Sequence, residues 1–256
     1  MSAEQDRAAL RALLDRSRLT EPPYERQGYL DVLGEDDHQP STLAQLAMRS
    51  GVVASIYQHG WRQGLNVAMG VGGLSAEQER RYALRCLELS GADRVLDVAC
   101  GPGNFSHVFA EALTGDGLVV GLDNSRQMLA RAVTDNLVPR LAYLRADARA
   151  MPFPDGSFDA VCCYAALYLA PEPFTILVEM LRVLAPGGRI ALMTSYRGSW
   201  QPQRFARGLA GHASGIRMFE RDDLTGILRA SGLTDIHQEI RGIAQFVNAR
   251  KPGQRG

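Results

Sequence analysis

The sequence is poor in cysteine and has no long apolar run. Its four cysteines, Cys86, Cys100, Cys162 and Cys163, form no C-x-x-C pair, the spacing that redox motifs and many zinc sites use. We therefore predict no metal site and no disulfide framework, and expect reduced thiols in a cytoplasmic protein. The chain also lacks an apolar stretch long enough to cross a bilayer, and its charged N-terminus is unlike a signal peptide.

An excess of either charge is absent as well. Lysine plus arginine and aspartate plus glutamate both number 28, so the formal net charge is zero. This balance argues against a nucleic-acid partner held by broad attraction to phosphates. The 256 residues suffice for one large domain with a single core and an added segment.

What the sequence does have is a regular alternation of apolar strands and helices. Five strands are predicted at 95–99, 118–123, 141–145, 158–164 and 189–195, with helices between them. Strands this apolar are typical of a parallel sheet covered on both faces. Pro186-Gly187-Gly188 fits a type II turn, and two final strands at 234–240 and 243–248 form a hairpin across Arg241-Gly242.

The segment before this alternation, residues 1–74, is predicted to be an N-terminal helical cap or lid. Ser2 with Gln5 makes a capping box for a helix to about Ser17, and a second helical region starts near residue 41. Tyr57 and Trp61 lie four residues apart, on one side of a helix. They are either packing core or a lid over a ligand. Residues 75–249 form the main domain, 196–220 a substrate-side insertion, and 250–256 a tail.

One turn organises the main domain. Asp97 ends the first strand, and Gly101-Pro102-Gly103 precede the next helix. Glycine lets a ligand approach the backbone closely, and the helix start offers free N–H groups. Ser106 stands where a dinucleotide fingerprint has its third glycine.

Three carboxylates reach the same sheet edge, which is where ligands bind in such folds. They are Asp97, Asp123 after the second strand, and Asp147 after the third. Asp123 suits a ribose diol, because a carboxylate accepts two hydroxyl hydrogen bonds, and Asp147 suits an adenine amine. Asp97 beside the turn favours a positively charged cofactor over a pyrophosphate. The alternative is three solvated loop acids.

Four motifs in order then carry a family resemblance: LDVACGPGNFS, VVGLDNSRQML, RADARAMPFPDGSFDAV and LRVLAPGGRIAL. Over about 100 residues the chain resembles class I S-adenosylmethionine-dependent methyltransferases, closest to the ubiquinone and menaquinone branch. The resemblance implies an α/β, Rossmann-like, seven-stranded, mostly parallel sheet of order 3-2-1-4-5-7-6. It implies S-adenosyl-L-methionine as cofactor and S-adenosyl-L-homocysteine as product.

The resemblance also implies cofactor contacts along these motifs. The expected cofactor-binding residues are Asp97, Ala99, Gly101, Gly103, Asp123, Asn124, Met128, Asp147, Ala148 and Tyr164, with Tyr57 and Trp61 from the lid. Pro102 replaces the family's usual threonine or serine. Cys162-Cys163-Tyr164-Ala165 lacks the Asn-Pro-Pro-Tyr tetrad of exocyclic-amine methyltransferases, which counts against nucleobase amines.

No catalytic residue is assigned, because a sulfonium methyl needs alignment more than a strong base. The candidate bases are Tyr164, Tyr168, His59 and His212. The expected partner is a small-molecule acceptor, moderately apolar, methylated on oxygen or carbon: a polyketide, phenol, quinone-like ring or fatty acyl compound. One or two of Arg197, Arg204, Arg207 and Arg217 meet a polar acceptor, or all belong to a solvated loop. A homodimer is left open.

Two other functions remain as alternatives. The first is a regulatory or scaffolding protein that binds the cofactor without turnover. The second is a nicotinamide-dependent dehydrogenase, against which the missing third glycine and Asp97 both speak.

Overall fold

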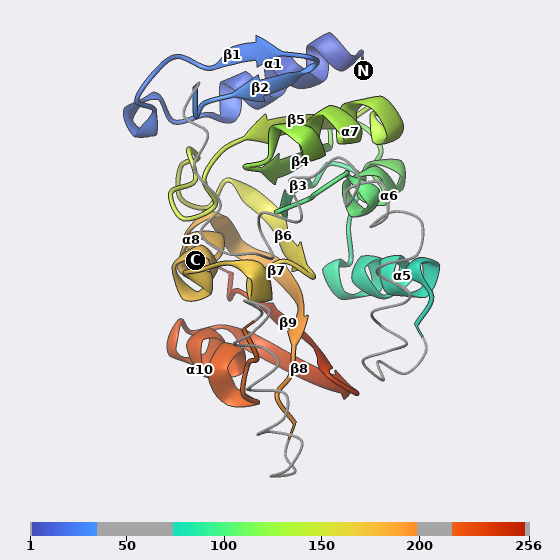
Figure 1. Ribbon diagram of the computed structural model, residues 1–256, viewed down its shortest axis with the longest axis vertical. Coiled ribbons are helices and arrows are strands. Elements are labelled where there is room, and N and C mark those ends of the chain that lie inside the picture. The colour runs from blue at the N-terminus through green and yellow to red at the C-terminus, as the bar shows by residue number, and fades with distance from the viewer. Residues whose placement is uncertain (1, 35–73, 199–216, 254–256) are drawn as a thin grey trace.

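A nine-stranded sheet forms the centre of the protein. The computed structural model describes residues 2–34, 74–198 and 217–253. Within these residues the strand order is β1-β2-β5-β4-β3-β6-β7-β9-β8 (Figure 1). The strands are β1 Tyr24–Arg26, β2 Tyr29–Asp31, β3 Arg94–Val98, β4 Leu118–Asp123, β5 Leu141–Arg145, β6 Phe158–Tyr164, β7 Leu184–Ser195, β8 Thr234–Arg241 and β9 Ala244–Arg250.

Seven of these strands have the predicted order. β5-β4-β3-β6-β7-β9-β8 corresponds to 3-2-1-4-5-7-6, and β9 runs antiparallel to β7. The apolar run of each central strand is explained by burial on both faces. On β3, for example, Val95 packs into one hydrophobic cluster while Leu96 and Val98 pack into the other. The predicted mostly parallel α/β sheet is therefore confirmed.

Helices cover both faces (Figure 1). One cluster contains side chains of α5, α6 and α7, and the other contains side chains of α1, α8 and α10. The helices are α1 Ala3–Leu13, α5 Ala76–Leu87, α6 Asn104–Ala112, α7 Arg126–Asn136, α8 Pro173–Val183 and α10 Asp222–Ala230, with 3-10 turns η1 Arg16–Arg18 and η3 Leu167–Leu169.

Local sequence signals explain where several helices begin. The capping boxes of Ser2 with Gln5 and Ser75 with Gln78 both form, and the Ser125 side chain accepts from the backbone N–H of Met128 at the start of α7. Each cap satisfies N–H groups that have no partner inside the helix. α1 ends at Leu13, earlier than the sequence predicts.

The N-terminal hairpin β1–β2 is the main departure from the predicted fold. It adds two strands to the predicted seven, because β2 pairs in parallel with β5 at the sheet edge. Gln27 and Gly28 make the turn with φ of 48° and 88°. Strands of three residues are too short for an alternation pattern to be detected. In the described part of the expected helical cap, α1 forms the predicted helix, whereas β1 and β2 extend the main sheet. Residues 35–73 lie outside the described residues.

The predicted turn at Pro186-Gly187-Gly188 lies inside β7 instead of before it. Phe158 pairs with Leu184 and Ala160 with Arg189, so β7 bulges between these two pairs. Gly187 has a φ of 82° in this bulge and donates its N–H to the Lys251 carbonyl at 2.9 Å. β9 runs to Arg250, so the start of the expected tail is ordered by pairing.

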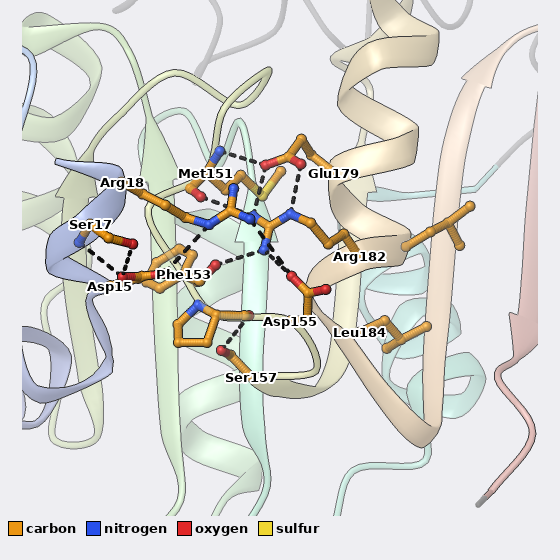
Figure 2. A network of polar contacts seen from close by, with 12 residues as sticks. Asp15, Ser17, Arg18, Met151, Phe153, Asp155, Ser157, Glu179, Arg182 and Leu184 are labelled. Carbon is orange, nitrogen blue, oxygen red and sulfur yellow. Dashed lines mark hydrogen bonds and ion pairs between the residues drawn. The ribbon is translucent and has the colours of Figure 1, made fainter. Parts of the chain in front are cut away.

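An arginine on α8 fixes the loop that follows β5 (Figure 2). Arg182 donates to the carbonyls of Phe153 at 2.7 Å and Met151 at 3.0 Å, and pairs with Asp155 and Glu179 at 2.8 and 2.7 Å. These contacts satisfy backbone oxygens that a loop cannot pair by itself. They hold the segment between β5 and β6 against α8.

Candidate active site

A cavity of about 400 Å³ opens at the carboxyl ends of β3, β4, β5 and β6. It collects most of the residues that the sequence analysis assigned to the cofactor. Of the expected cofactor residues that the structure describes, those lining it are Ala99, Gly101, Asp123, Asn124, Met128, Asp147, Ala148 and Tyr164. The volume falls within the range of about 300–1,000 Å³ typical of small-molecule sites.

The turn after β3 forms the floor of this cavity. Ala99, Gly101 and Gly103 all have positive φ, at 55°, 56° and 82°. A Cβ on Gly101 would meet no atom within 4 Å, whereas one on Gly103 would collide with the ring of Tyr143. Gly101 therefore leaves room for a ligand, while Gly103, which does not line the cavity, leaves room for Tyr143.

Asp123 connects the turn to the next loop. Its carboxylate accepts the backbone N–H of Gly101 at 2.9 Å and that of Ser125 at 2.8 Å. Burial raises the pKa of Asp123, and these two N–H groups oppose the shift by favouring the charged form. A carboxylate has about four acceptor sites, so the group retains capacity for a hydroxyl pair.

Asp97 lies beneath the turn and does not line the cavity. The Ser106 hydroxyl donates to it at 2.6 Å and the Cys162 thiol at 3.5 Å. Burial raises the pKa of Asp97 to about 6. The serine that replaces the third glycine of the dinucleotide pattern thus has a definite partner. In these contacts Asp97 supports the turn from below.

Asp147 lines the cavity but is bound to its neighbour Arg149. The Arg149 guanidinium donates to Asp147 at 2.7 Å and to Glu172, at the start of α8, at 2.7 Å. The hydrogen bonds to Asp147 raise the pKa of the Arg149 guanidinium more than any other contact does, and those to Glu172 add to this effect. Arg149 joins the loop after β5 to the segment before α8, and no spacing rule in the sequence would have indicated this.

Tyr164 packs flat against the cavity wall. Its ring stacks on Phe105, with centroids 4.7 Å apart, and burial raises the Tyr164 pKa well above its usual range. A phenol of this kind stays protonated at neutral pH, which argues against Tyr164 as a base. Tyr168 is half-buried in η3 and does not line the cavity.

A second part of the cavity lining, which we call the apolar wall, consists of apolar side chains, and the sequence analysis did not predict most of it. It is formed by the end of β6, by η3 and by the first turn of α8. Its members include Cys163, Ala165, Ala166, Leu167, Leu169, Ala170, Pro171 and Ile176. The available signal was the apolar run after β6 (Ala165 to Pro171), which looks the same as ordinary core in one sequence.

The remaining predicted residues fall into two groups. Tyr57, His59, Trp61, Arg204, Arg207 and His212 lie outside the described residues. Arg197 pairs with Glu220 at 3.4 Å, and the Arg217 guanidinium lies 5.3 Å from the centre of the Phe174 ring. The described arginines of the 196–220 segment are therefore engaged away from the cavity.

Comparison with known proteins places the chain in a family. The family described as "Methyltransferase domain" matches residues 95–188. An uncharacterised methyltransferase of Synechocystis is 31% identical over 205 residues, covering 76% of this chain and 93% of that protein. The chain belongs to the methyltransferase family that these two matches describe.

Two further relatives match this chain over only part of their own length. An uncharacterised chloroplastic methyltransferase of Arabidopsis thaliana is 30% identical over 226 residues, 85% of this chain. This chain spans about 63% of its length. A 2-phytyl-1,4-naphtoquinone methyltransferase of Synechococcus elongatus is 35% identical over 124 residues, 46% of this chain and 52% of that protein.

The fold also occurs in solved structures. A phosphoethanolamine N-methyltransferase of Haemonchus contortus, in complex with S-adenosyl-L-methionine, superposes with a TM-score of 0.59 at 16% identity. The match covers 79% of this chain and 57% of that one. No helix within the described residues has the length and apolarity that a membrane span requires.

Proposed function

We propose that this protein binds S-adenosyl-L-methionine in the cavity and transfers its methyl group to oxygen or carbon of a small, moderately apolar molecule, with quinone-like and phenolic rings as the first class. The observation that carries the proposal is one cavity whose lining combines two kinds of group. Carboxylates and an open glycine turn line it together with the apolar wall. A relative named as a naphtoquinone methyltransferase supports the acceptor class.

The residues present fit an adenosyl cofactor. Asp123 has acceptor capacity for the ribose hydroxyls, and the open space beside Gly101 admits the methionine portion. Met128 is nearly buried and lines the cavity, where its thioether can pack on the adenine face. We assign the adenine edge to Asp147 and Ala148, which line the same cavity. Bound there, the cofactor supplies a methyl group on a good leaving group.

The apolar wall determines what the chain itself contributes to the reaction. Its described ionisable members are Cys163 and Tyr164, and burial raises the pKa of both. Neither is a base at neutral pH. Among the described residues the apolar wall thus orients the acceptor and excludes water without supplying a base, which favours an acceptor with an acidic hydroxyl or carbon of its own. Phenols, hydroquinones and enols meet this requirement, whereas unactivated alcohols do not.

A turnover assay tests the proposal. The protein is incubated with S-adenosyl-L-methionine and with matched pairs of a phenol or naphthohydroquinone and its saturated alcohol, and S-adenosyl-L-homocysteine is quantified by mass spectrometry. Methylation of the acidic member of each pair supports the proposal. Methyl transfer to protein or RNA alone, or binding of cofactor with no turnover on any acceptor, would contradict it. The relatives described above carry methyltransferase names and do not support the second outcome.

A further inference from the structure

Three charged residues lie in line across the sheet edge that carries the N-terminal hairpin. Arg145 on β5 is the register partner of Asp123 on β4 and of Asp31 on β2. Side chains at paired positions of parallel strands share one face of the sheet. The hairpin thus brings a carboxylate into the row that ends at the predicted ribose acid.

Arg145 uses its position to bind both neighbouring strands. Its Nη1 donates to Asp31 Oδ2 at 3.1 Å and to the Gly34 carbonyl at 2.8 Å, and its Nε donates to the Asn124 carbonyl at 3.1 Å. Asp31 and Arg145 are 0% and 1% exposed. The guanidinium is held on one side by the hairpin, and on the other it fixes the loop directly after Asp123.

Asp31 also shapes the cavity wall. Its Oδ1 accepts the backbone N–H of Leu33 at 2.9 Å, and Leu33 lines the cavity. Arg126, in the first turn of α7, donates to the same Gly34 carbonyl at 2.5 Å. The end of the hairpin is therefore joined to the loop and helix that follow β4, through buried charge and backbone carbonyls.

A purely structural role does not require these residue types. An apolar pair can often replace a buried ion pair with no loss of stability. What an apolar pair cannot provide is the Nε–H that fixes the Asn124 carbonyl. Because Asn124 and Asp123 are adjacent and both line the cavity, displacement of this carbonyl moves the carboxylate beside it.

We propose that the N-terminal hairpin is part of the cofactor site, and that Asp31 and Arg145 are positioning residues for the ribose-binding loop 123–125. The proposal rests on the proposed function, because it assigns the ribose of the cofactor to Asp123. It adds a partner strand and the buried Asp31, both of which lie outside the four family motifs, to Arg145, which is the first residue of the third motif.

Binding of S-adenosyl-L-homocysteine and its 2′-deoxy analogue, measured by calorimetry, tests the proposal without turnover. Arg145→Lys keeps the charge opposite Asp31 but loses the Nε–H donor. The double variant Asp31→Asn with Arg145→Met removes both buried charges and keeps an acceptor for the Leu33 N–H. Glu25→Gln on β1 is the matched control, since Glu25 pairs with Arg7 at 2.9 Å on the half-exposed outer edge.

We expect both test variants to weaken binding of the ribose compound by about tenfold, the effect of one hydrogen bond to a charged group. Binding of the deoxy analogue should change far less, so that discrimination between the two compounds falls. Glu25→Gln should behave as wild type. Unchanged affinity in the variants, or an equal loss for both compounds, would overturn the proposal.

The remaining outcomes are also decisive. If both test variants fail to fold while Glu25→Gln folds, the pair serves stability and the positioning role is refuted. If wild-type protein binds neither compound, the proposed function fails first, and this result is distinct from a variant-specific effect.

Discussion

The two glycines of the turn after β3 should respond differently to substitution by alanine, one mainly in stability and the other mainly in cofactor binding. Gly101 and Gly103 both have positive φ, so alanine is strained at either position. Only at Gly103 would the new methyl group collide with Tyr143, and only Gly101 faces the cavity. Gly103→Ala should therefore reduce stability, and Gly101→Ala should reduce cofactor binding.

The expected magnitudes follow from these two environments. Left-handed backbone costs a non-glycine residue about 1–2 kcal/mol, and overpacking adds about 1–3 kcal/mol. Gly103→Ala combines both, a loss near 3 kcal/mol that lowers Tm by roughly 6–12 °C in a protein of this size. Gly101→Ala carries only the first cost, but its methyl group overpacks the ligand, which weakens binding by roughly 5- to 150-fold.

Thermal unfolding and calorimetric titration with S-adenosyl-L-homocysteine give the two quantities for both variants. Tyr143→Phe in the Gly103→Ala background is the control, because it removes the hydroxyl nearest the added methyl group and should restore part of the Tm. The reasoning is refuted if the two alanine variants lose equal stability, or if the Tyr143→Phe change restores none of the loss at Gly103.

Three further predictions concern the acids and thiols around the cavity. Asp123→Asn should weaken S-adenosyl-L-homocysteine binding by roughly 10- to 100-fold, because charge-assisted hydrogen bonds to the ribose are lost; calorimetry giving wild-type affinity would exclude the assignment. Burial raises the pKa of Asp97 to about 6, so the unliganded fold binds more protons than the unfolded chain and loses stability as pH rises through that value, by about 3 kcal/mol at neutral pH. The free energy of unfolding of Asp97→Asn, measured by urea titration, should therefore increase relative to that of wild type as pH rises from about 4 to 7. The reasoning is contradicted if the unfolding free energies of the two proteins change in parallel with pH. Cys100 and Cys163 line the cavity and Cys162 does not, so bound S-adenosyl-L-homocysteine should slow alkylation of the first two selectively, as read by peptide mass spectrometry; uniform protection would place the ligand elsewhere.

The central sheet could be predicted from sequence because each strand is a continuous apolar run. Burial on both faces demands such runs, so the strands ending at Asp123 and Tyr164 were predicted at their observed positions. The carboxylates were predicted because each of them lies at, or just after, the end of one of these apolar runs. Position alone could not show that Asp97 is buried beneath the turn while Asp123 lines the cavity.

The hairpin and the charged connections could not be predicted. β1 and β2 have three residues each, too few for a periodic pattern. The pair of Asp31 and Arg145 spans 114 positions, and in one sequence nothing links two charges that far apart. Arg149 was missed because an arginine two residues after an aspartate is typical of any solvated loop.

The separation of Asp31 from Arg145 has a consequence for the order in which the chain folds. β2 forms ladders with β1 and β5, and β5 is synthesised more than a hundred residues later. Until β5 takes its place, the carboxylate of Asp31 stays hydrated and the hairpin has no template, since contacts between distant segments form late. The protein should therefore complete the proposed ribose-binding loop 123–125 after most of its sheet. Recovery of S-adenosyl-L-homocysteine binding during refolding should then lag behind the recovery of the far-ultraviolet circular dichroism signal.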